Sequence, residues 1–319
     1  MEYVKLGNTD IKVSKICLGC MSFGEVGTMH DWTLDEVATE KVVKHALDLG
    51  INFFDTANVY SKGSSEIFLG KALKKYAKRE DVVIASKVYF NEGHLSKEAI
   101  LREIDGTLNR LGTSYLDLYI IHRFDYDTPI SEVMETLDSL VKCGKVRAIG
   151  ASAMYTYQFA LMQEYAKEHN LTQFVAMEDH YNLLYREDER DMIPYCKETN
   201  VLLMPYSPLA SGHLARPTWN KDSLRSRTDT TMRSKYDHAM KEDMVIVSRV
   251  KEIADAHNVT MTEVALAWML NKGIQSPIIG ATKLAYIDDA VNALKLKLTN
   301  EEIAYLEEEY VPHTIVGAI

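Results

Sequence analysis

The sequence lacks the features that mark secreted, membrane-spanning or nucleic-acid-binding proteins. Its four cysteines among 319 residues are too few for a disulfide-stabilised scaffold. No apolar run approaches the ~20 residues that span a bilayer, and the polar start, residues 1–5, has no signal-peptide core. The net charge of −10 argues against broad binding to nucleic acid or to an anionic membrane. We therefore expect a soluble cytoplasmic protein.

Metal-binding patterns are also scarce. Cys17 and Cys20 have the spacing of a redox pair or of half a zinc site, but no second pair follows, and Cys17 lies inside an apolar run. The ten histidines show no metal-ligand spacing. We interpret the cysteines as reduced, buried or rim thiols, with a redox or metal role as the alternative, and we predict no metal site.

Short apolar segments alternate with helical segments eight times. Each predicted strand is bounded by polar residues or glycine, as expected for strands that are buried on both faces. The predicted strands are 16–18, 51–54, 82–86, 116–121, 146–149, 173–177, 201–205 and 276–279. The helical period between them is clearest at 34–49, 66–77, 96–111, 130–143 and 155–168.

Eight such units in one chain predict the α/β class and a closed (β/α)8 TIM barrel. An open dinucleotide-binding sheet would carry an early glycine-rich loop, but residues 18–24 have the wrong spacing for it. Because no linker or longer repeat interrupts the alternation, we expect residues 1–319 to form a single domain.

Three additions to the barrel are predicted. Residues 4–14 resemble a hairpin that plugs the N-terminal end of the barrel. The polar stretch 210–241, after the seventh strand, is long enough to act as a lid or a binding segment. Residues 260–272 and 299–310 read as extra helices.

Polar residues follow three consecutive predicted strands. Asp55, Lys87 and His122 each come directly after such a strand, and Tyr60 stands five positions beyond Asp55. A β/α barrel collects the C-terminal ends of its strands on one face, where catalysis is done. We therefore predict that a carboxylate, a phenol, an ammonium and an imidazole meet in one pocket.

Together these groups can give a proton to a carbonyl oxygen. A free phenol has a pKa near about 10, and the ammonium of Lys87 would favour the phenolate and so lower the pKa of Tyr60. Asp55 would keep Lys87 charged, and His122 would orient the carbonyl oxygen. Each residue alone has a structural alternative: Asp55 as a cap, Lys87 as a solvated charge, and His122 as a satisfied polar residue.

The sequence resembles the aldo-keto reductase family over nearly its whole length. The match is carried, in order and with family spacing, by Phe54-Asp55-Thr56-Ala57, Tyr60, Gly63, Ser65-Glu66, Leu69-Gly70, Ser86-Lys87, Ile121-His122-Arg123, Ile149-Gly150-Ala151-Ser152, residues 180–186, residues 206–210, residues 277–283 and the tail 306–313. It is most similar to a bacterial and fungal branch with aryl-alcohol dehydrogenase-like members, which is related to potassium-channel β-subunits.

The resemblance implies an NADPH-dependent oxidoreductase that interconverts aldehydes or ketones and alcohols. Tyr60 would be the general acid, with Asp55, Lys87 and His122 completing the catalytic set. The implied cofactor-binding positions are Gly19, Met21, Ser152, Glu178, Tyr206, Ser207, Leu209, Ser211, Leu214, Gly280, Thr282, Lys283 and Asp289. Tyr206 would stack on the nicotinamide, and Lys283, just before a helix, would bind the 2′-phosphate that distinguishes NADPH from NADH. A solvated Lys283 is the alternative.

Glu178 departs from the family pattern, which usually has Gln at this position. If ionised, Glu178 can only accept hydrogen bonds, and its negative charge would stabilise NADP⁺ relative to NADPH by ~1 kcal/mol. The alternative is that Glu178 turns away. Ala153 and Ala290 replace Asn residues that are frequent in the family, which puts one cofactor hydrogen bond in doubt at each position.

The expected substrate rim is aromatic, with one fixed cation, and suits aromatic or medium-sized carbonyl compounds. It comprises Phe23, Trp32, Tyr89, Arg123 and Phe124. The sequence predicts neither the physiological substrate nor the oligomeric state. A second hypothesis is a nicotinamide-cofactor-binding regulatory subunit with little turnover, and a third is a barrel lyase or isomerase without a nicotinamide.

Overall fold

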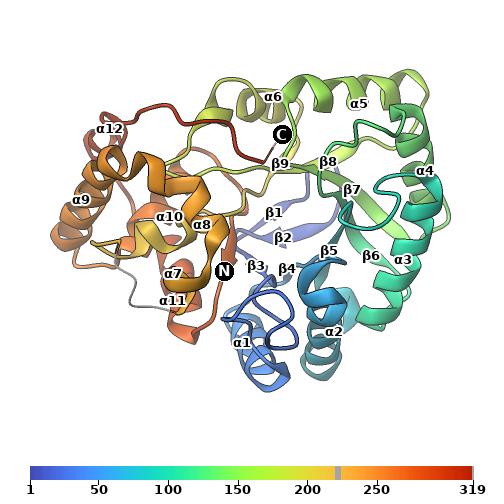
Figure 1. The fold of residues 1–319 in the computed structure, drawn as a ribbon, viewed down its shortest axis with the longest axis horizontal. Helices are drawn as coiled ribbons and strands as arrows, with labels where there is room; N and C mark the ends of the chain where they lie inside the picture. Colours follow the sequence, from blue (N-terminus) through green and yellow to red (C-terminus); the bar gives the residue numbers. More distant parts are fainter. Residues whose placement is uncertain (220–223, 318–319) are drawn as a thin grey trace.

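The computed structural model describes residues 1–219 and 224–317, and its centre is a barrel of eight parallel strands (Figure 1). The strands are β3 (Cys17–Gly19), β4 (Phe53–Asp55), β5 (Val83–Val88), β6 (Leu116–Ile121), β7 (Val146–Ser152), β8 (Phe174–Glu178), β9 (Leu202–Leu203) and β10 (Ile278–Gly280). They are hydrogen-bonded in the order β10-β3-β4-β5-β6-β7-β8-β9. Backbone bonds from Ser276 N to Leu203 O (3.2 Å) and from Ile278 N to Pro205 O (2.9 Å) close the ring. The predicted barrel is confirmed.

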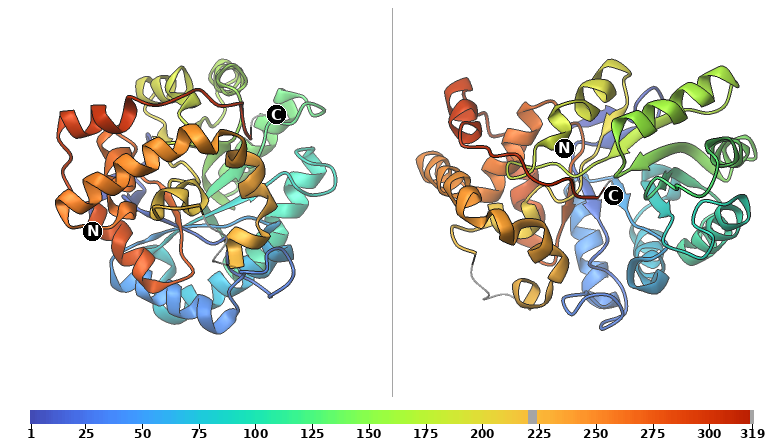
Figure 2. Two further views of the ribbon diagram at one scale, coloured as in Figure 1. Left: turned by 60° about the vertical axis from the view of Figure 1, so that its left-hand side comes forward. Right: turned by 45° about the horizontal axis from the view of Figure 1, so that its top comes forward.

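Helices surround the barrel (Figure 2). Those of the repeat are α1 (Glu36–Asp48), α2 (Ser64–Tyr76), α3 (Lys97–Leu111), α4 (Ile130–Lys142), α5 (Thr156–Glu168), α6 (Met192–Glu198) and α11 (Leu284–Ala293). The predicted extra helices are α10 (Met261–Asn271) and α12 (Asn300–Glu307), and α9 (Met240–His257) adds a further one. None of these described helices combines the length and the apolar character that a membrane span requires.

The hairpin of β1 (Tyr3–Lys5) and β2 (Lys12–Ser14) closes one end of the barrel, as predicted. Leu6, Ile11 and Val13 pack in one apolar cluster with inward-facing strand residues such as Phe53 and Leu118. Asn52, just before β4, accepts a hydrogen bond from Ser14 N and donates one to Lys12 O. The hairpin therefore covers the ends where the strands begin and leaves the opposite ends open to chemistry.

The stretch 210–241 is mostly short helices rather than an extended loop. It contains η4 (Ala210–Ala215), α7 (Leu224–Thr228), α8 (Thr230–Tyr236), η5 (Asp237–Ala239) and the start of α9; residues 220–223 of this prediction lie outside the described residues. The Arg225 guanidinium lies 4.4 Å from the centre of the Trp32 ring, and the Lys235 ammonium lies 4.9 Å from the centre of the Tyr206 ring. The segment therefore reaches across the end of the barrel at which the strands finish.

Candidate active site

The four predicted residues meet at the ends of adjacent strands. Asp55 is the last residue of β4, Lys87 is the penultimate residue of β5, and His122 follows β6 directly. Tyr60 begins the short helix η1 (Tyr60–Gly63) after β4. The side chains of Asp55, Lys87, Tyr60 and His122 are all buried.

Lys87 is the centre of this group. Its ammonium donates hydrogen bonds to Asp55 Oδ1, to Thr56 O at 3.0 Å and to the Tyr60 hydroxyl at 3.3 Å. These three acceptors use all three N–H bonds of the ammonium. Although burial lowers the pKa of Lys87, the carboxyl groups of Asp55 and Glu178 raise it well above its usual value, so Lys87 is charged.

The phenol responds to two opposed influences. Burial raises the pKa of Tyr60, and the neighbouring Lys87 ammonium opposes that shift. The interaction with Lys87 thus has the expected sign, but burial outweighs it in this structure, so the net direction differs from the sequence-based expectation. Tyr60 is therefore held in its protonated form, which is the form that a proton donor needs.

His122 is positioned by two aromatic rings. Its imidazole lies edge-on to Tyr60, with ring centres 5.9 Å apart, and to Phe90, with ring centres 4.9 Å apart. Burial, Lys87 and Arg123 lower the pKa of His122 well below its usual value, so the ring is neutral. Its buried Nδ1 has no hydrogen-bond partner among the described residues. Phe90 was missed by the sequence analysis, although it stands two positions beyond the end of β5.

Glu178 joins the site as the last residue of β8. Its Oε2 lies 3.4 Å from the Lys87 ammonium. Burial, followed by the charge of Asp55, raises the pKa of Glu178 to about 8. Glu178 is therefore mainly protonated at neutral pH, and the ionised side chain assumed from the sequence is not the dominant form.

The proposed cofactor residues continue around the same ends. Ser152 ends β7 and donates from its hydroxyl to Glu178 O at 2.8 Å. Gly19 is paired in register with both Asp55 and Gly280, the last residues of β4 and β10. Met21 is partly exposed just beyond β3. A Cβ added to Gly280 would meet no atom within 4 Å, so an open space adjoins that position.

The loop after β9 has the backbone shape of an anion cradle. Ser207, Ala210, Ser211 and Gly212 have φ values of 55°, 47°, 56° and 100°. Left-handed residues in a turn direct successive N–H groups toward one point, which favours anions such as phosphate. Leu209 is partly buried beside this loop, whereas Leu214 is fully buried in the core. These residues fit a pyrophosphate through backbone groups rather than through the Leu214 side chain.

Tyr206 already has several neighbours. The His180 ring stacks on it with centres 5.1 Å apart, and Lys235 lies over it. A Cβ added to Gly317 in the C-terminal tail would lie 2.7 Å from the Tyr206 hydroxyl. A nicotinamide ring that stacks on Tyr206 would therefore compete with Lys235 for the tyrosine face.

The residues predicted to bind the adenine end of the cofactor lie just before α11 and within it. Lys283 is the N-cap residue of that helix, and Thr282 precedes it. Asp289 lies within α11, where burial raises the pKa of its carboxyl group. An ammonium at a helix N-terminus favours an anion such as the 2′-phosphate.

Most of the expected substrate rim is accessible. Trp32, Tyr89, Arg123 and Phe124 are partly exposed, and the Arg123 guanidinium lies 5.5 Å from the centre of the Phe90 ring. Phe23 is fully buried in the core, so its side chain does not line the rim. The backbone of Phe23 forms an isolated parallel bridge with Leu34.

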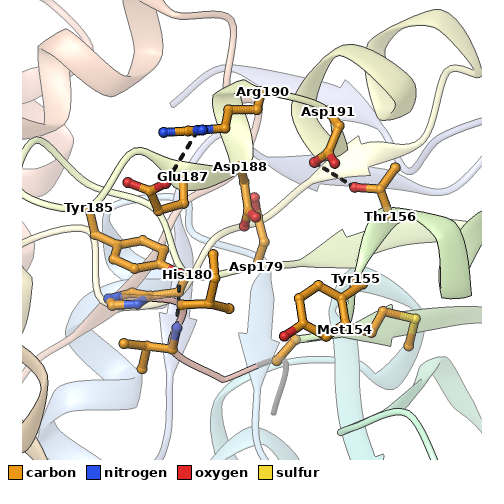
Figure 3. Close-up of a pocket in the computed structure, with 13 residues that line it drawn as sticks. Met154, Tyr155, Thr156, Asp179, His180, Tyr185, Glu187, Asp188, Arg190 and Asp191 are labelled. Atoms are coloured by element: carbon orange, nitrogen blue, oxygen red, sulfur yellow. Dashed lines mark hydrogen bonds and ion pairs between the residues drawn. The ribbon is translucent and has the colours of Figure 1, made fainter. Parts of the chain in front are cut away.

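A cavity of about 160 Å³ is lined by the segments that follow β7 and β8 and by the C-terminal tail (Figure 3). Asp179, the residue directly after β8, lines this cavity beside Asp188. Burial raises the pKa of Asp188 to about 7. The C-terminal tail covers the cavity, because Val316 N donates to the Tyr185 hydroxyl at 3.0 Å. Among residues 1–219 and 224–317, no group of three or more side chains has a metal-binding arrangement.

The chain is similar to proteins of one family over nearly its whole length. A sequence model of the aldo/keto reductase family matches residues 15–310. The chain is 42% identical to the versiconal hemiacetal acetate reductase of Aspergillus parasiticus, over 99% of this chain and 98% of that protein. It is also 42% identical, with the same coverage, to a Schizosaccharomyces pombe protein provisionally named an aryl-alcohol dehydrogenase. Among solved structures, a thermostable aldo-keto reductase crystallised with the inhibitor epalrestat has a TM-score of 0.78 and 28% identity, over 97% of this chain and 100% of that one.

Proposed function

Because this chain belongs to the aldo/keto reductase family, we propose that it is an NADPH-dependent oxidoreductase that reduces aldehydes and ketones to alcohols, reversibly. The observation that carries the proposal is the contact between one buried ammonium and both a carboxylate and a phenol. Lys87 donates to Asp55 and to Tyr60, and the neutral His122 ring stands beside the phenol. When bound, NADPH supplies a hydride to the carbonyl carbon.

The chain's own residues manage the oxygen of the carbonyl. Tyr60 donates its proton to that oxygen, and the phenolate that remains is stabilised by the Lys87 ammonium at 3.3 Å. Asp55 keeps the ammonium in place through a buried ion pair. His122, being neutral, donates a hydrogen bond without competing to lose a proton. In the oxidative direction the same groups act in reverse.

The aromatic rim supports a bulky or aromatic carbonyl substrate. The Phe90 ring contacts both His122 and Arg123, and Tyr89 lies edge-on to Phe90 with ring centres 5.1 Å apart. The names of the relatives, a hemiacetal acetate reductase and an aryl-alcohol dehydrogenase, favour the same class. All four residues of the expected catalytic set, Asp55, Tyr60, Lys87 and His122, are present. This favours an enzyme over a regulatory subunit.

The first test is NADPH oxidation with a panel of aromatic and aliphatic aldehydes, comparing wild type with Tyr60→Phe. Loss of the hydroxyl should lower the rate on the order of 10²- to 10⁴-fold, as for other general acids, with NADPH affinity nearly unchanged. Tyr119→Phe is the matched control, because the Tyr119 hydroxyl is buried like that of Tyr60 but has no hydrogen-bond partner in the described chain. Equal rates in wild type and Tyr60→Phe would refute the assignment, and tight NADPH binding without turnover would support the regulatory alternative.

Cofactor preference has its own test at Lys283. If its ammonium binds the 2′-phosphate, Lys283→Met should weaken NADPH binding on the order of tenfold, as expected for one charge-assisted contact. NADH binding should change little, because NADH has no phosphate at that position. Lys295→Met, beyond the end of α11, is the control. Equal losses for the two cofactors would show that Lys283 does not select between them.

A further inference from the structure

Two buried carboxyl groups share one cation in the candidate active site. Asp55 and Glu178 are 2% and 3% exposed, and both have Lys87 as their ion-pair partner in the described chain. One ammonium cannot neutralise two carboxylates, and an uncompensated buried charge is costly. The arrangement therefore favours a form in which one of the two carboxyl groups keeps a proton.

The hydrogen bonds indicate which atoms hold that proton. The three N–H bonds of Lys87 go to Asp55 Oδ1, Thr56 O and the Tyr60 hydroxyl, so none is directed to Glu178 Oε2. Glu178 Oε2 and Asp55 Oδ2 are both buried and have no donor among residues 1–219 and 224–317. The two carboxyl groups are within hydrogen-bonding reach of each other, so a proton carried by Glu178 and shared with Asp55 satisfies both oxygens at once.

We propose that Glu178 is protonated in the resting site and that this O–H group donates a hydrogen bond to Asp55. After each reduction Lys87 returns a proton to Tyr60, and Glu178 is the proton reserve that replaces the proton lost by Lys87. The last part rests on the proposed function, whereas the first does not. Glu178 acts through Lys87 and is therefore a positioning and proton-supplying residue.

The proton transfers balance in three steps. The Tyr60 O–H bond breaks as the O–H bond of the alcohol forms. A Lys87 N–H bond breaks as the Tyr60 O–H bond forms again, and the Glu178 O–H bond breaks as the Lys87 N–H bond is restored across the 3.4 Å gap. Glu178 then takes a proton from solvent, and none of these transfers needs an oxidant or a reductant.

The charges around Glu178 set the pH at which this reserve is lost. Burial and Asp55 raise the pKa of Glu178, whereas Lys87 and Arg123 lower it, and the balance is about 8. The other titratable groups that act with Glu178 are Cys17 on β3, Tyr60 after β4, Asp179 after β8 and Tyr206 after β9. Once ionised, Glu178 also raises the pKa of Tyr60, which makes the phenol a weaker acid.

The decisive test labels glutamate carboxyl carbons with ¹³C and follows the protein without cofactor by infrared titration from about pH 6 to about pH 10. One protonated glutamate band should disappear near pH 8 in wild type and be absent throughout in Glu178→Gln. The label excludes Asp179 and Asp188, and Asp188→Asn should keep the band. Complete ionisation of every glutamate already at about pH 6 would overturn the proposal from the wild-type spectrum alone, even if Glu178→Gln failed to fold.

Kinetics then test the reserve itself. For aldehyde reduction, wild-type kcat should fall by up to tenfold per pH unit above about pH 8, whereas Glu178→Gln should be several-fold slower at neutral pH and lack that inflection. Asp188→Asn should keep the wild-type profile. If the same pH-dependent fall in kcat persists in Glu178→Gln, Glu178 is not the proton source for Lys87, whatever the infrared result. An inactive wild type with a titrating Glu178 band would count against the proposed function and the relay but not against the protonated state.

Discussion

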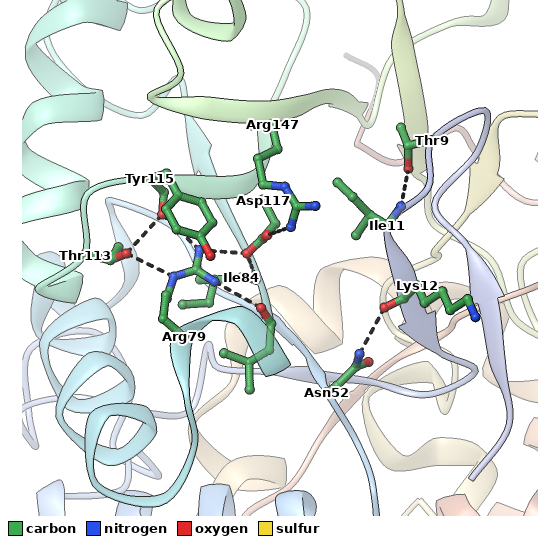
Figure 4. A network of polar contacts seen from close by, with 11 residues as sticks. Thr9, Ile11, Lys12, Asn52, Arg79, Ile84, Thr113, Tyr115, Asp117 and Arg147 are labelled. Atoms are coloured by element: carbon green, nitrogen blue, oxygen red, sulfur yellow. Dashed lines mark hydrogen bonds and ion pairs between the residues drawn. The ribbon is translucent and has the colours of Figure 1, made fainter.

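Two buried ion clusters at opposite ends of the barrel are built from similar parts but differ in how fully their polar atoms are paired. Asp117, near the start of β6, accepts hydrogen bonds from Arg79 Nη2 (2.7 Å), Ile84 N (3.0 Å) and Arg147 Nη1 (2.6 Å) (Figure 4). This single carboxylate has two cations, and each of its oxygens has a donor. In the cluster at the opposite end, Lys87 has two carboxyl groups, and each of these has an oxygen without a donor in the described chain.

The difference separates stability from chemistry. The saturated cluster ties together the starts of β5, β6 and β7, through Ile84, Asp117 and Arg147 (Figure 4). The unsaturated cluster lies at the strand ends, where unpaired buried atoms and an extra carboxyl group leave room for proton movement. Barrel enzymes generally place stability and catalysis at these same opposite ends. Substitutions in the two clusters should therefore affect different measurements.

The largest expected effect is on activity, from removing the shared ammonium. Lys87→Met leaves Tyr60 without its stabilising cation and should lower carbonyl reduction on the order of 10³-fold. NADPH affinity, measured by fluorescence titration, should change only a few-fold. Lys145→Met, which breaks an exposed pair with Asp105, is the matched control. Retention of a tenth or more of the wild-type rate would show that Lys87 is not needed for proton transfer.

The next effect is on folding, from opening the saturated cluster. Asp117→Ala leaves two guanidinium groups without their carboxylate and should lower the free energy of unfolding by about 3 kcal/mol, near the low end for buried pairs because both arginines are partly exposed. Urea denaturation measures this loss. The kcat of the folded fraction should stay near the wild-type value, and a large drop in kcat would show that the two clusters are not independent.

The smallest effect concerns stability and pH. Burial raises the pKa of Glu178 from its ordinary 4.5 to about 8, so between these values the folded protein holds a proton that the unfolded chain has released. Wild-type stability should therefore fall as pH rises through this window. The upper limit of the fall is a few kcal/mol, at about 1.4 kcal/mol per pKa unit.

Glu178→Gln cannot titrate, so its stability should decline less between pH 5 and pH 8 than that of wild type in parallel urea titrations. Asp188, whose pKa burial raises to about 7, contributes a decline of the same sign to both proteins and cancels in the comparison. Parallel stability curves for the two proteins would mean that Glu178 is ionised in the folded state.

Much of the site was predictable because strand patterns are local. Asp55, Lys87 and His122 each follow an apolar run, and a barrel brings such positions to one face whatever the details of packing. The hairpin plug and the extra helices α10 and α12 were predictable for the same reason. Their signals are periodicity and turn residues that lie within a few positions of one another.

Other features depend on neighbours that are distant in the sequence. Phe90 beside His122, Lys235 over Tyr206 and the inward turn of Phe23 arise from packing between separate elements. The short helices within 210–241 are polar, so no apolar period revealed them. The roles of the cofactor and substrate positions stay predictions.

The sequence by itself determined the barrel and the residue types at its strand ends. The reason is that the alternation of apolar strand segments with helical segments, and the order of the residues that follow them, are local properties of the chain. Only the tertiary structure decided the protonation of those residues. The burial of Glu178 and Tyr60, and the charges around them, depend on residues from several strands. As a result Glu178 is protonated where an ionised side chain was expected, and the pKa of Tyr60 is raised where a lowered pKa was expected.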